Sequence, residues 1–278
     1  MPELPEVLTI KKDLEKEILN KVIIEVEMIS NYPTKPQFSE LKPFLLNKKV
    51  VQVSNVAKLL TVHLEDENIL AIHLNMSGRL LYNTTDPFVK IKITFSSNDI
   101  LNFSSVRMFE TFRIMQPADL EKYKKQYGKI IIDPNLSLSE FISQMKKKNT
   151  YIKNNLLDQK PISGIGNIYA TDALFLSKIN PKEKSHKITD SEYKSLFENL
   201  KLLINEGILH RGSTIDRYTD LYGKPGTHQK HFRIYGKKSS PCTVCGNSVT
   251  FEKMNGRGTY YCENCQKPNK TQHNSLFT

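Results

Sequence analysis

The chain has 278 residues, of which 38% are hydrophobic and 25% are charged, and its mean hydropathy is −0.44. No apolar run approaches the roughly 18 residues that a membrane-spanning helix needs, so the composition excludes a helical membrane protein and fits a soluble globular one. A formal net charge of +11 and a pI near 9.3 favour polyanionic partners, of which nucleic acid is the commonest in a cell.

The first predicted element is an amphipathic helix over residues 5–21. Its apolar residues recur at steps of three and four, which is the spacing of one helix face. These residues are Val7, Ile10, Leu14 and Ile18. We therefore expect a helix with one buried face close to the N-terminus.

From residue 22 to about residue 115 the pattern changes to short β-rich runs separated by polar or proline-containing breaks. Many short strands with turn signals between them predict a sandwich or a barrel. The runs are VIIEVEMI, VVQVSNVAKLLTVHL, NILAIHL, FVKIKITF, DILNFSS and TFRIM. A polar, basic stretch over residues 116–136 follows them and is predicted to be a linker.

The second half of the chain has a helical period. Two predicted helices begin with a capping-box pattern, the first at Ser137 with Glu140 and the second at Thr189 with Glu192. Between them, residues 155–179 contain two apolar helical stretches around a turn with two glycines. This arrangement is typical of a helix-two-turns-helix motif. A loop over residues 213–229 follows, rich in turn residues.

All four cysteines lie near the C-terminus in two CxxC pairs, which is the spacing of a zinc ribbon. They are Cys242, Cys245, Cys262 and Cys265. Two disulfides are the competing interpretation, but no secretory signal precedes them and the spacing favours metal. Four thiolates around one ion close the site, so we expect one structural Zn²⁺ per chain, and Gly246 should adopt a left-handed turn beneath it.

The N-terminus offers a nucleophile. Removal of Met1 would leave Pro2 as a secondary amine that titrates near pH 8 and can attack an aldehydic carbon to give an iminium. Glu3 beside it could transfer a proton. By themselves these residues favour the simpler interpretation, an ordinary helix start with acidic residues in its first turn. Likewise, the glycine turn before Asn167 could cradle a phosphate or simply join two helices.

Taken together, these features resemble the formamidopyrimidine-DNA glycosylases, base-excision enzymes related to endonuclease VIII. The resemblance runs from about residue 2 to residue 266, and its specificity comes from the order of the motifs. In chain order these are PELPEV, NVAKLL, HLNMSGRL, VRMF, LLDQKPISGIGNIYA, GKPG and GRGTYYCENCQ.

The resemblance implies the catalytic residues. Pro2 is implied to attack C1′ of the damaged nucleoside, and Glu3 to protonate the sugar ring oxygen. Glu6 matches a second carboxylate near the lesion pocket. Lys58, which the pattern places on a strand, is implied to act beside the nucleophile and to hold the backbone phosphate.

It also implies the residues that hold DNA. Asn167 and Arg257 match the phosphate clamp around the flipped nucleotide. Three further residues match the set that fills the gap left by the flipped base, in which Arg contacts the orphaned partner base. They are Met76, Arg107 and Phe109.

Four positions depart from the family pattern. Asp172 stands where glutamate is more common, and Glu110 stands where glycine is usual, which would put a negative charge near DNA. Thr227 and His228 replace residues that are often aromatic, in the loop that closes over the lesion in the family. These departures leave the preferred lesion less defined than the reaction.

The sequence therefore predicts an α+β multidomain fold: an N-terminal β-sandwich that carries the catalytic helix, then a helical domain with the helix-two-turns-helix motif and the zinc ribbon. The expected segments are the catalytic domain (1–117), a linker (118–136), the helical domain with the lesion loop (137–239), the zinc finger (240–267) and a disordered tail (268–278).

The predicted function is that of a bifunctional DNA glycosylase and AP lyase for oxidised purines in duplex DNA. One alternative is an endonuclease VIII-like glycosylase for oxidised pyrimidines, which the PELPE start and the complete Met–Arg–Phe set disfavour. The other is a non-catalytic damaged-DNA-binding module of the same fold. We expect a monomer with no membrane contact, in the bacterial cytoplasm with the nucleoid.

Overall fold

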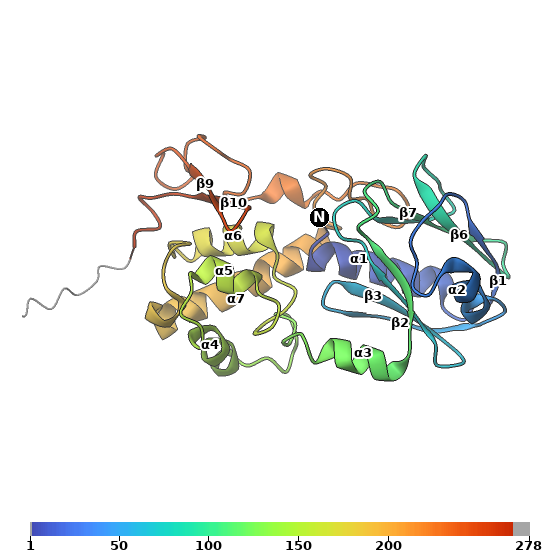
Figure 1. Cartoon of the computed structure of the whole chain (residues 1–278). Helices are drawn as coiled ribbons and strands as arrows, with labels where there is room; N and C mark the ends of the chain where they lie inside the picture. Colours follow the sequence, from blue (N-terminus) through green and yellow to red (C-terminus); the bar gives the residue numbers. More distant parts are fainter. Residues whose placement is uncertain (1, 269–278) are drawn as a thin grey trace, which may run out of the picture. The chain divides into compact units, whose positions relative to one another are not determined.

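The computed structural model describes residues 2–268, which divide into two compact units (Figure 1). The first unit contains residues 2–128 and 204–231, and the second contains residues 129–203 and 232–268. The segment 204–231 thus belongs with the N-terminal part of the chain, although it follows the helical part in sequence. The domain bounds expected from the sequence, such as 1–117 for the catalytic domain, remain a prediction. No helix within residues 2–268 is long and apolar enough to cross a bilayer.

The first unit is a sandwich of two antiparallel four-stranded sheets, as the sequence predicts. One sheet has the order β1 (Ile23–Met28), β6 (Val89–Phe95), β7 (Ile100–Ser104) and β5 (Arg79–Tyr82). The other has the order β2 (Val50–Val56), β3 (Leu59–Leu64), β4 (Ile69–His73) and β8 (Thr111–Met115). Phe103 and Phe112, one from each sheet, meet at 5.1 Å between ring centroids, so the inward faces form one apolar core.

Helix α1 (Leu4–Ile18) confirms the predicted N-terminal helix, and all four residues of its predicted apolar face are buried. It ends three residues before the predicted end, since Leu19 already has an extended backbone. Two helices were not predicted: α2 (Phe38–Leu45) lies inside the stretch assigned to strands, and α3 (Pro117–Lys124) begins the stretch assigned to a linker.

The run VVQVSNVAKLLTVHL is two strands rather than one, because the chain reverses between β2 and β3. The register pairs Val56 with Leu59, so Ala57 and Lys58 form a tight turn. Ala57 adopts a positive φ of 49°. The prediction that Lys58 lies on a strand is therefore wrong. Nothing in the sequence marks this turn, because glycine, asparagine and proline, the usual signals, are absent from it.

The second unit is mainly helical. Its elements are α4 (Leu138–Lys146), α5 (Ile152–Leu157), α6 (Asn167–Leu176), η1 (Ser185–Lys187), the start of α7 (Asp190–Leu209), and the hairpin β9 (Thr250–Met254) and β10 (Arg257–Tyr261). Ser137 Oγ accepts a hydrogen bond from the Glu140 amide, and Thr189 and Glu192 form a reciprocal capping box, so both predicted helix starts are confirmed. Helices α5 and α6 with the turn between them are the predicted helix-two-turns-helix. Of the expected tail, residues 269–278 lie outside the described part of the chain.

Candidate active site and nucleic-acid interface

The start of α1 gathers three side chains in a buried setting. Pro2 is buried, and Glu3 and Glu6 are 2% and 1% exposed. The Glu3 amide donates to Glu6 Oε2 at 2.7 Å, while the Ser213 amide donates to Glu6 Oε1 at 2.7 Å. Glu6 therefore fixes both the first turn of α1 and the start of the loop over residues 213–229.

Glu6 is also placed to hold a proton near neutral pH. Burial raises the pKa of Glu6 to about 7, and the neighbouring charge of Glu3 acts in the same direction. The backbone N–H groups that donate hydrogen bonds to Glu6 act in the opposite direction. A carboxyl group that is partly protonated at neutral pH can give or take a proton there. Two adjacent buried carboxyl groups beside Pro2 are a setting for acid–base chemistry.

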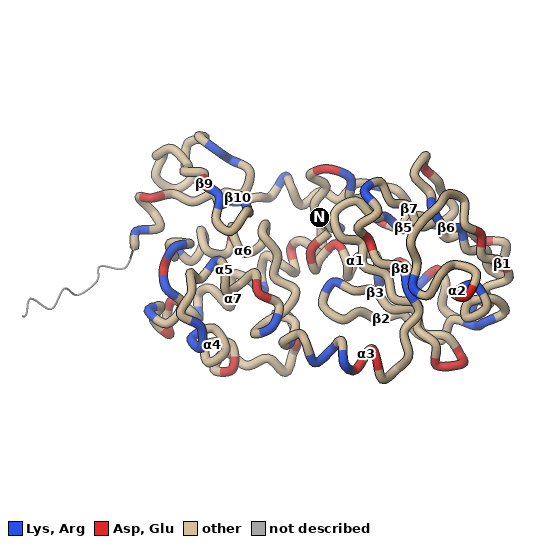
Figure 2. Tube along the Cα trace, viewed as in Figure 1, with Lys and Arg blue, Asp and Glu red and all other residues tan. Residues whose placement is uncertain are grey.

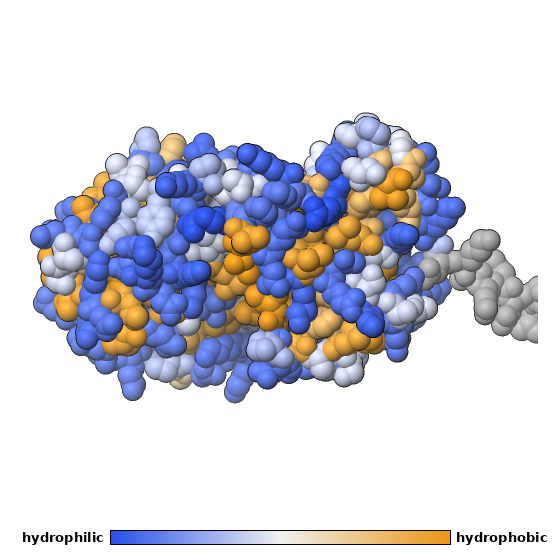
Figure 3. Space-filling view, turned by 180° about the vertical axis from the view of Figure 1, so that it is seen from behind, coloured by the Kyte–Doolittle hydropathy of each residue, from blue (hydrophilic) through white to orange (hydrophobic). Residues whose placement is uncertain are grey.

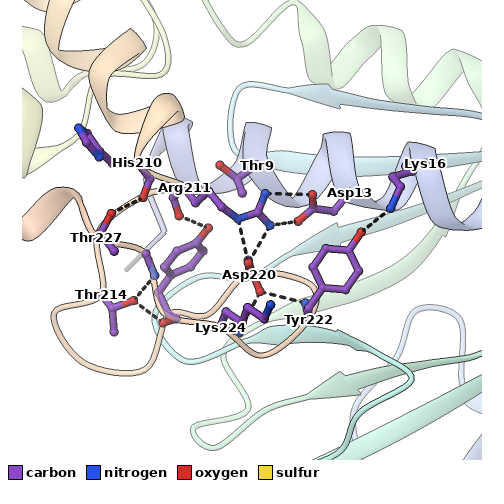
Figure 4. A network of polar contacts seen from close by, with 12 residues as sticks. Thr9, Asp13, Lys16, His210, Arg211, Thr214, Asp220, Tyr222, Lys224 and Thr227 are labelled. Atoms are coloured by element: carbon purple, nitrogen blue, oxygen red, sulfur yellow. Dashed lines mark hydrogen bonds and ion pairs between the residues drawn. The ribbon is translucent and has the colours of Figure 1, made fainter.

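A second network ties α1 to the same loop, and the sequence analysis missed it (Figure 4). The Arg211 guanidinium donates to Asp13 Oδ2 at 2.5 Å and to Asp220 Oδ2 at 2.7 Å, and the two aspartates are 6% and 2% exposed. A signal for it exists: Glu6, Thr9 and Asp13 are polar residues at helical spacing, and all three are buried. Buried polar residues on a helix need partners from elsewhere in the fold.

One end of the sheet β2-β3-β4-β8 collects several of the predicted DNA contacts. Leu59 pairs with His73 and His73 pairs with Thr111, so the β2–β3 turn, the end of β4 and the start of β8 lie together. Lys58 lies in that turn. Its charge, after burial, helps to lower the pKa of His73 to about 4, which indicates that the two side chains are close. His73 stays neutral and accepts a hydrogen bond from the Asn75 amide at 3.1 Å.

The predicted gap-filling residues lie on the two loops that leave this end of the sheet. Met76, Arg107 and Phe109 are all exposed, Phe109 by 69%, and Arg107 Nη1 lies 3.7 Å from Met76 Sδ. Apolar patches occur elsewhere on the surface too, as Figure 3 shows for one face, so exposure alone marks no site. Two apolar side chains and an arginine on adjacent loops are the distinguishing feature.

Glu110 does not carry its charge outward as the sequence analysis expected. It is 6% exposed, and its carboxylate accepts hydrogen bonds from the Ser77 amide at 3.1 Å, from Ser77 Oγ at 2.7 Å, and from Ser105 Oγ. It therefore joins the two gap-filling loops at their base. Gly78 makes room for it, because a Cβ there would meet Glu110 Cγ at 2.5 Å. A single-residue pattern cannot distinguish such an inward carboxylate from an exposed one.

In the second unit, Asn167 and Arg257 are brought together by the finger hairpin. Asn167 Nδ2 donates to the Gly258 carbonyl at 3.1 Å, next to Arg257. The same carbonyl accepts from Lys153 Nζ at 2.8 Å, and Lys153 is 1% exposed. This lysine anchors the hairpin on α5 and was missed. A surface pocket of about 250 Å³ beside it is lined by Asn154, Leu157, Asp158, Asn255 and Arg257.

The four cysteines converge in the finger. The sulfurs of Cys242 and Cys265 are 3.9 Å apart and those of Cys245 and Cys262 are 3.5 Å apart, and none of the four forms a disulfide in the described chain. Thiolates around a tetrahedral Zn²⁺ with bonds of about 2.3 Å would be ~3.8 Å apart, so the cluster fits that ion. Gly246 has a φ of 76°, as expected for the first knuckle.

Comparisons with known proteins agree along the chain. Family models match as the formamidopyrimidine-DNA glycosylase N-terminal domain over residues 1–112, the formamidopyrimidine-DNA glycosylase H2TH domain over residues 131–219, and a zinc finger found in FPG and IleRS over residues 239–268. A formamidopyrimidine-DNA glycosylase from Pelotomaculum thermopropionicum is 33% identical over 275 residues, which covers 96% of this chain and 99% of the relative. The chain belongs to the formamidopyrimidine-DNA glycosylase family. This is a family of DNA glycosylases of base excision repair.

Solved structures give the same result. The Lactococcus lactis Fpg in complex with DNA containing an abasic site has a TM-score of 0.88 and 30% identity, and the match covers 96% of this chain and all of that one. A mutant of the same protein in complex with DNA containing Fapy-dG has the same score and coverage.

A second relative found by sequence, the formamidopyrimidine-DNA glycosylase of Ureaplasma parvum, is 34% identical over 278 residues. The match covers 96% of this chain and 100% of the relative.

Two of the residues that depart from the family pattern, Asp172 and His228, are buried and contact neighbouring residues. Asp172 is 1% exposed and accepts hydrogen bonds from the amides of Arg233, Ile234 and Tyr235, so it fixes the approach to the finger. His228 is fully buried, with Nδ1 3.2 Å from Ser213 Oγ, and burial lowers its pKa to about 4.

Lysine and arginine are spread over both units (Figure 2), which fits a DNA-binding family.

Proposed function

We propose that this chain is a bifunctional DNA glycosylase and AP lyase that removes oxidised purines, 8-oxoguanine and formamidopyrimidines, from duplex DNA. The observation that carries the proposal is the burial of Pro2 at the start of α1 beside the carboxyl groups of Glu3 and Glu6. The Lactococcus lactis relative was solved with DNA containing an abasic site and with DNA containing Fapy-dG, which supports the same substrate class here.

In the proposed reaction, the neutral secondary amine of Pro2, freed by removal of Met1, uses its lone pair to bond C1′. The bond between C1′ and the base breaks, and the base leaves with that electron pair and takes up a proton, while the Pro2 nitrogen gives up its N–H proton and regains a lone pair. Glu3 then protonates the sugar ring oxygen as the C1′–O4′ bond opens, which leaves an iminium. Loss of the C2′ proton expels the 3′ phosphate, and a second elimination expels the 5′ phosphate.

DNA is held from both units in this proposal. Lys58, Asn167 and Arg257 bind backbone phosphates, and the gap-filling loops occupy the space left by the flipped base. Glu6 lies near the lesion pocket and positions both α1 and the loop base through its two backbone hydrogen bonds. One Zn²⁺ on the four cysteines holds the finger that presents Arg257, and one chain suffices for activity.

The test is borohydride trapping on a duplex with 8-oxoguanine opposite cytosine. Hydride should reduce the iminium and link Pro2 covalently to DNA, and strand cleavage without borohydride should leave a one-nucleotide gap. Glu3→Gln should bind DNA but not excise the base, because it loses the acidic proton and keeps the shape. A chain that retains Met1 or carries an acetylated N-terminus is the matched control and should give no adduct.

The outcomes separate the three candidate functions. An adduct formed only with oxidised pyrimidines would place the chain with the endonuclease VIII-like enzymes. If the uncapped chain gives no adduct with oxidised purine, oxidised pyrimidine or plain abasic DNA, the enzyme proposal fails. Tight binding to those same duplexes would then identify a damaged-DNA-binding module.

A further inference from the structure

A group of metal-ligand side chains lies outside the four-cysteine finger, at the end of α7. Glu206 lies in the last turn of this helix, His210 directly follows it, and His231 comes from the short helix η2 (His228–His231), all within the first unit. One ligand atom from each of the three lies within 4.8 Å of the other two. The imidazoles of His210 and His231 are nearly parallel, at 19°, with centroids 3.9 Å apart.

Local geometry explains the convergence. His210 follows the last residue of α7, and its amide donates to the Glu206 carbonyl at 3.0 Å, so the two side chains keep the four-residue helical spacing that lets a pair bind the same ion. Backbone hydrogen bonds hold η2 against the end of that helix: the Thr227 amide donates to the His210 carbonyl at 2.9 Å, and the His228 amide donates to the Gly212 carbonyl at 3.0 Å. Figure 4 shows the His210 imidazole turned away from the Arg211 network, so the ion pairs of Asp13 and Asp220 do not occupy it.

The donor set selects the class of ion. Two imidazoles and one carboxylate suit a borderline divalent transition metal such as Zn²⁺, whereas Mg²⁺ and Ca²⁺ prefer oxygen donors. Around a tetrahedral ion with bonds of 2.0–2.1 Å, such donors would be ~3.3 Å apart. An imidazole binds a metal in the plane of its ring, so one of the two stacked rings must also turn before His210 and His231 can share an ion. Glu206, His210 and His231 are all partly exposed, which leaves their side chains room for that rotation. The fourth position is open to water.

His228 lies behind the carboxylate of Glu206. Its Nε2 lies 3.7 Å from Glu206 Oε2, and its Nδ1 faces Ser213 Oγ at 3.2 Å. The first distance is longer than a hydrogen bond. In the proposed site His228 would therefore orient the carboxylate only after the ion has drawn Glu206 into place, which is the usual function of groups behind a metal site. Ser213 in turn donates its amide to Glu6, so the site lies at the base of the loop over residues 213–229.

We propose that Glu206, His210 and His231 form a second divalent-metal site, fitted to Zn²⁺, that clamps η2 to α7. The site is distinct from the four-cysteine finger in chemistry and in unit. It does not depend on the glycosylase proposal, because its evidence is the ligand set alone. The bound ion would fix the base of the loop that follows α7.

The test measures zinc content after dialysis of the full-length chain, purified without a histidine tag, against buffered micromolar free Zn²⁺. The wild-type chain should hold two zinc ions. His210→Gln and His231→Asn should each hold one, and His186→Gln, an exposed histidine of the second unit, should still hold two. His228→Phe should bind the second ion about 10–100-fold more weakly.

Cobalt distinguishes the two sites by their spectra. Co²⁺ on the cysteines gives intense thiolate charge-transfer bands, whereas Co²⁺ on histidine and glutamate gives only weak visible bands, and these weak bands should disappear in His210→Gln. Thermal melting of each variant checks that it is folded. A wild-type chain with a single zinc ion overturns the proposal. So does a second ion that persists in folded His210→Gln and His231→Asn, because that ion would be bound elsewhere.

Discussion

The β-sandwich and the finger are stabilised in different ways. The sandwich buries side chains from α1 and from both sheets in one continuous apolar cluster. The finger shares a small cluster in which two of the five buried residues are themselves cysteines, together with Phe175, Ile234 and Val249. A core of that size cannot offset the entropy of ordering the chain. The sandwich should therefore fold without metal, and the finger should not.

The largest expected effect tests this contrast directly. Cys262→Ser should release zinc from the finger and unfold it, at a cost on the order of 10 kcal/mol to this module, while the sandwich keeps its thermal transition. Loss of the hairpin would misplace Arg257, so DNA affinity should fall with the start of α1 intact. Val244→Ser, at a 66% exposed position of the other knuckle of the finger, is the control and should keep both zinc and affinity. Full DNA binding by a metal-free Cys262→Ser chain would refute the assigned role.

The next effect concerns the gap-filling loops, which depend on a buried carboxylate rather than on apolar packing. Glu110→Ala should destabilise the first unit by about 2–4 kcal/mol, because it leaves buried donors of Ser77 and Ser105 without their acceptor. Opposite-base discrimination should fall with it, since Arg107 is held from the same loops. Glu121→Ala, on the exposed face of α3, is the matched control. Unchanged urea unfolding and unchanged discrimination in Glu110→Ala would show that the loops are held by other contacts.

A pH titration isolates the buried carboxyl at the start of α1. The pKa of Glu6 rises from 4.5 to about 7 in the folded chain, so the folded state keeps a proton that the unfolded state releases over that interval. The stability contributed by this group is thus fully present below the lower value and is lost as the pH rises through the upper one. The loss is on the order of 3 kcal/mol. The lowered pKa values of His73 and His228 act in the opposite direction, but they are common to both chains. Urea unfolding across this window should therefore show the stability of the wild-type chain falling relative to that of Glu6→Gln. Parallel profiles would mean that Glu6 does not retain its proton.

The smallest effects separate base recognition from phosphate binding. Arg107→Ala should lose about 1–3 kcal/mol of discrimination for the base opposite the lesion. Lys58→Ala should weaken binding to all sequences alike and lower the salt slope by about one. Binding isotherms at several salt concentrations, with each of the four bases opposite the lesion, distinguish the two. Identical behaviour of the two variants would contradict the roles assigned to them.

The sequence by itself determined the elements that depend on local patterns. The apolar face of α1, the N-cap at Ser137, the capping box at Thr189 and the glycine-containing turn before Asn167 were predicted because neighbours in sequence decide them. At Ser137 only the half of the box in which the serine accepts from the Glu140 amide is formed. The four-cysteine spacing likewise fixes a knuckle geometry wherever it occurs. The order of the motifs along the chain was enough to indicate the family.

Only the tertiary structure decided which polar side chains are buried and which residues they contact. Lys58 lies in a turn because β2 pairs with β3, and Glu110 is buried because the loops after β4 and before β8 close around it. Asp13 pairs with Arg211, which is 198 positions away in the sequence. His231 stacks on His210 because η2 packs against the end of α7. Burial and hydrogen bonding between distant residues depend on how the elements pack, and no local spacing encodes that packing.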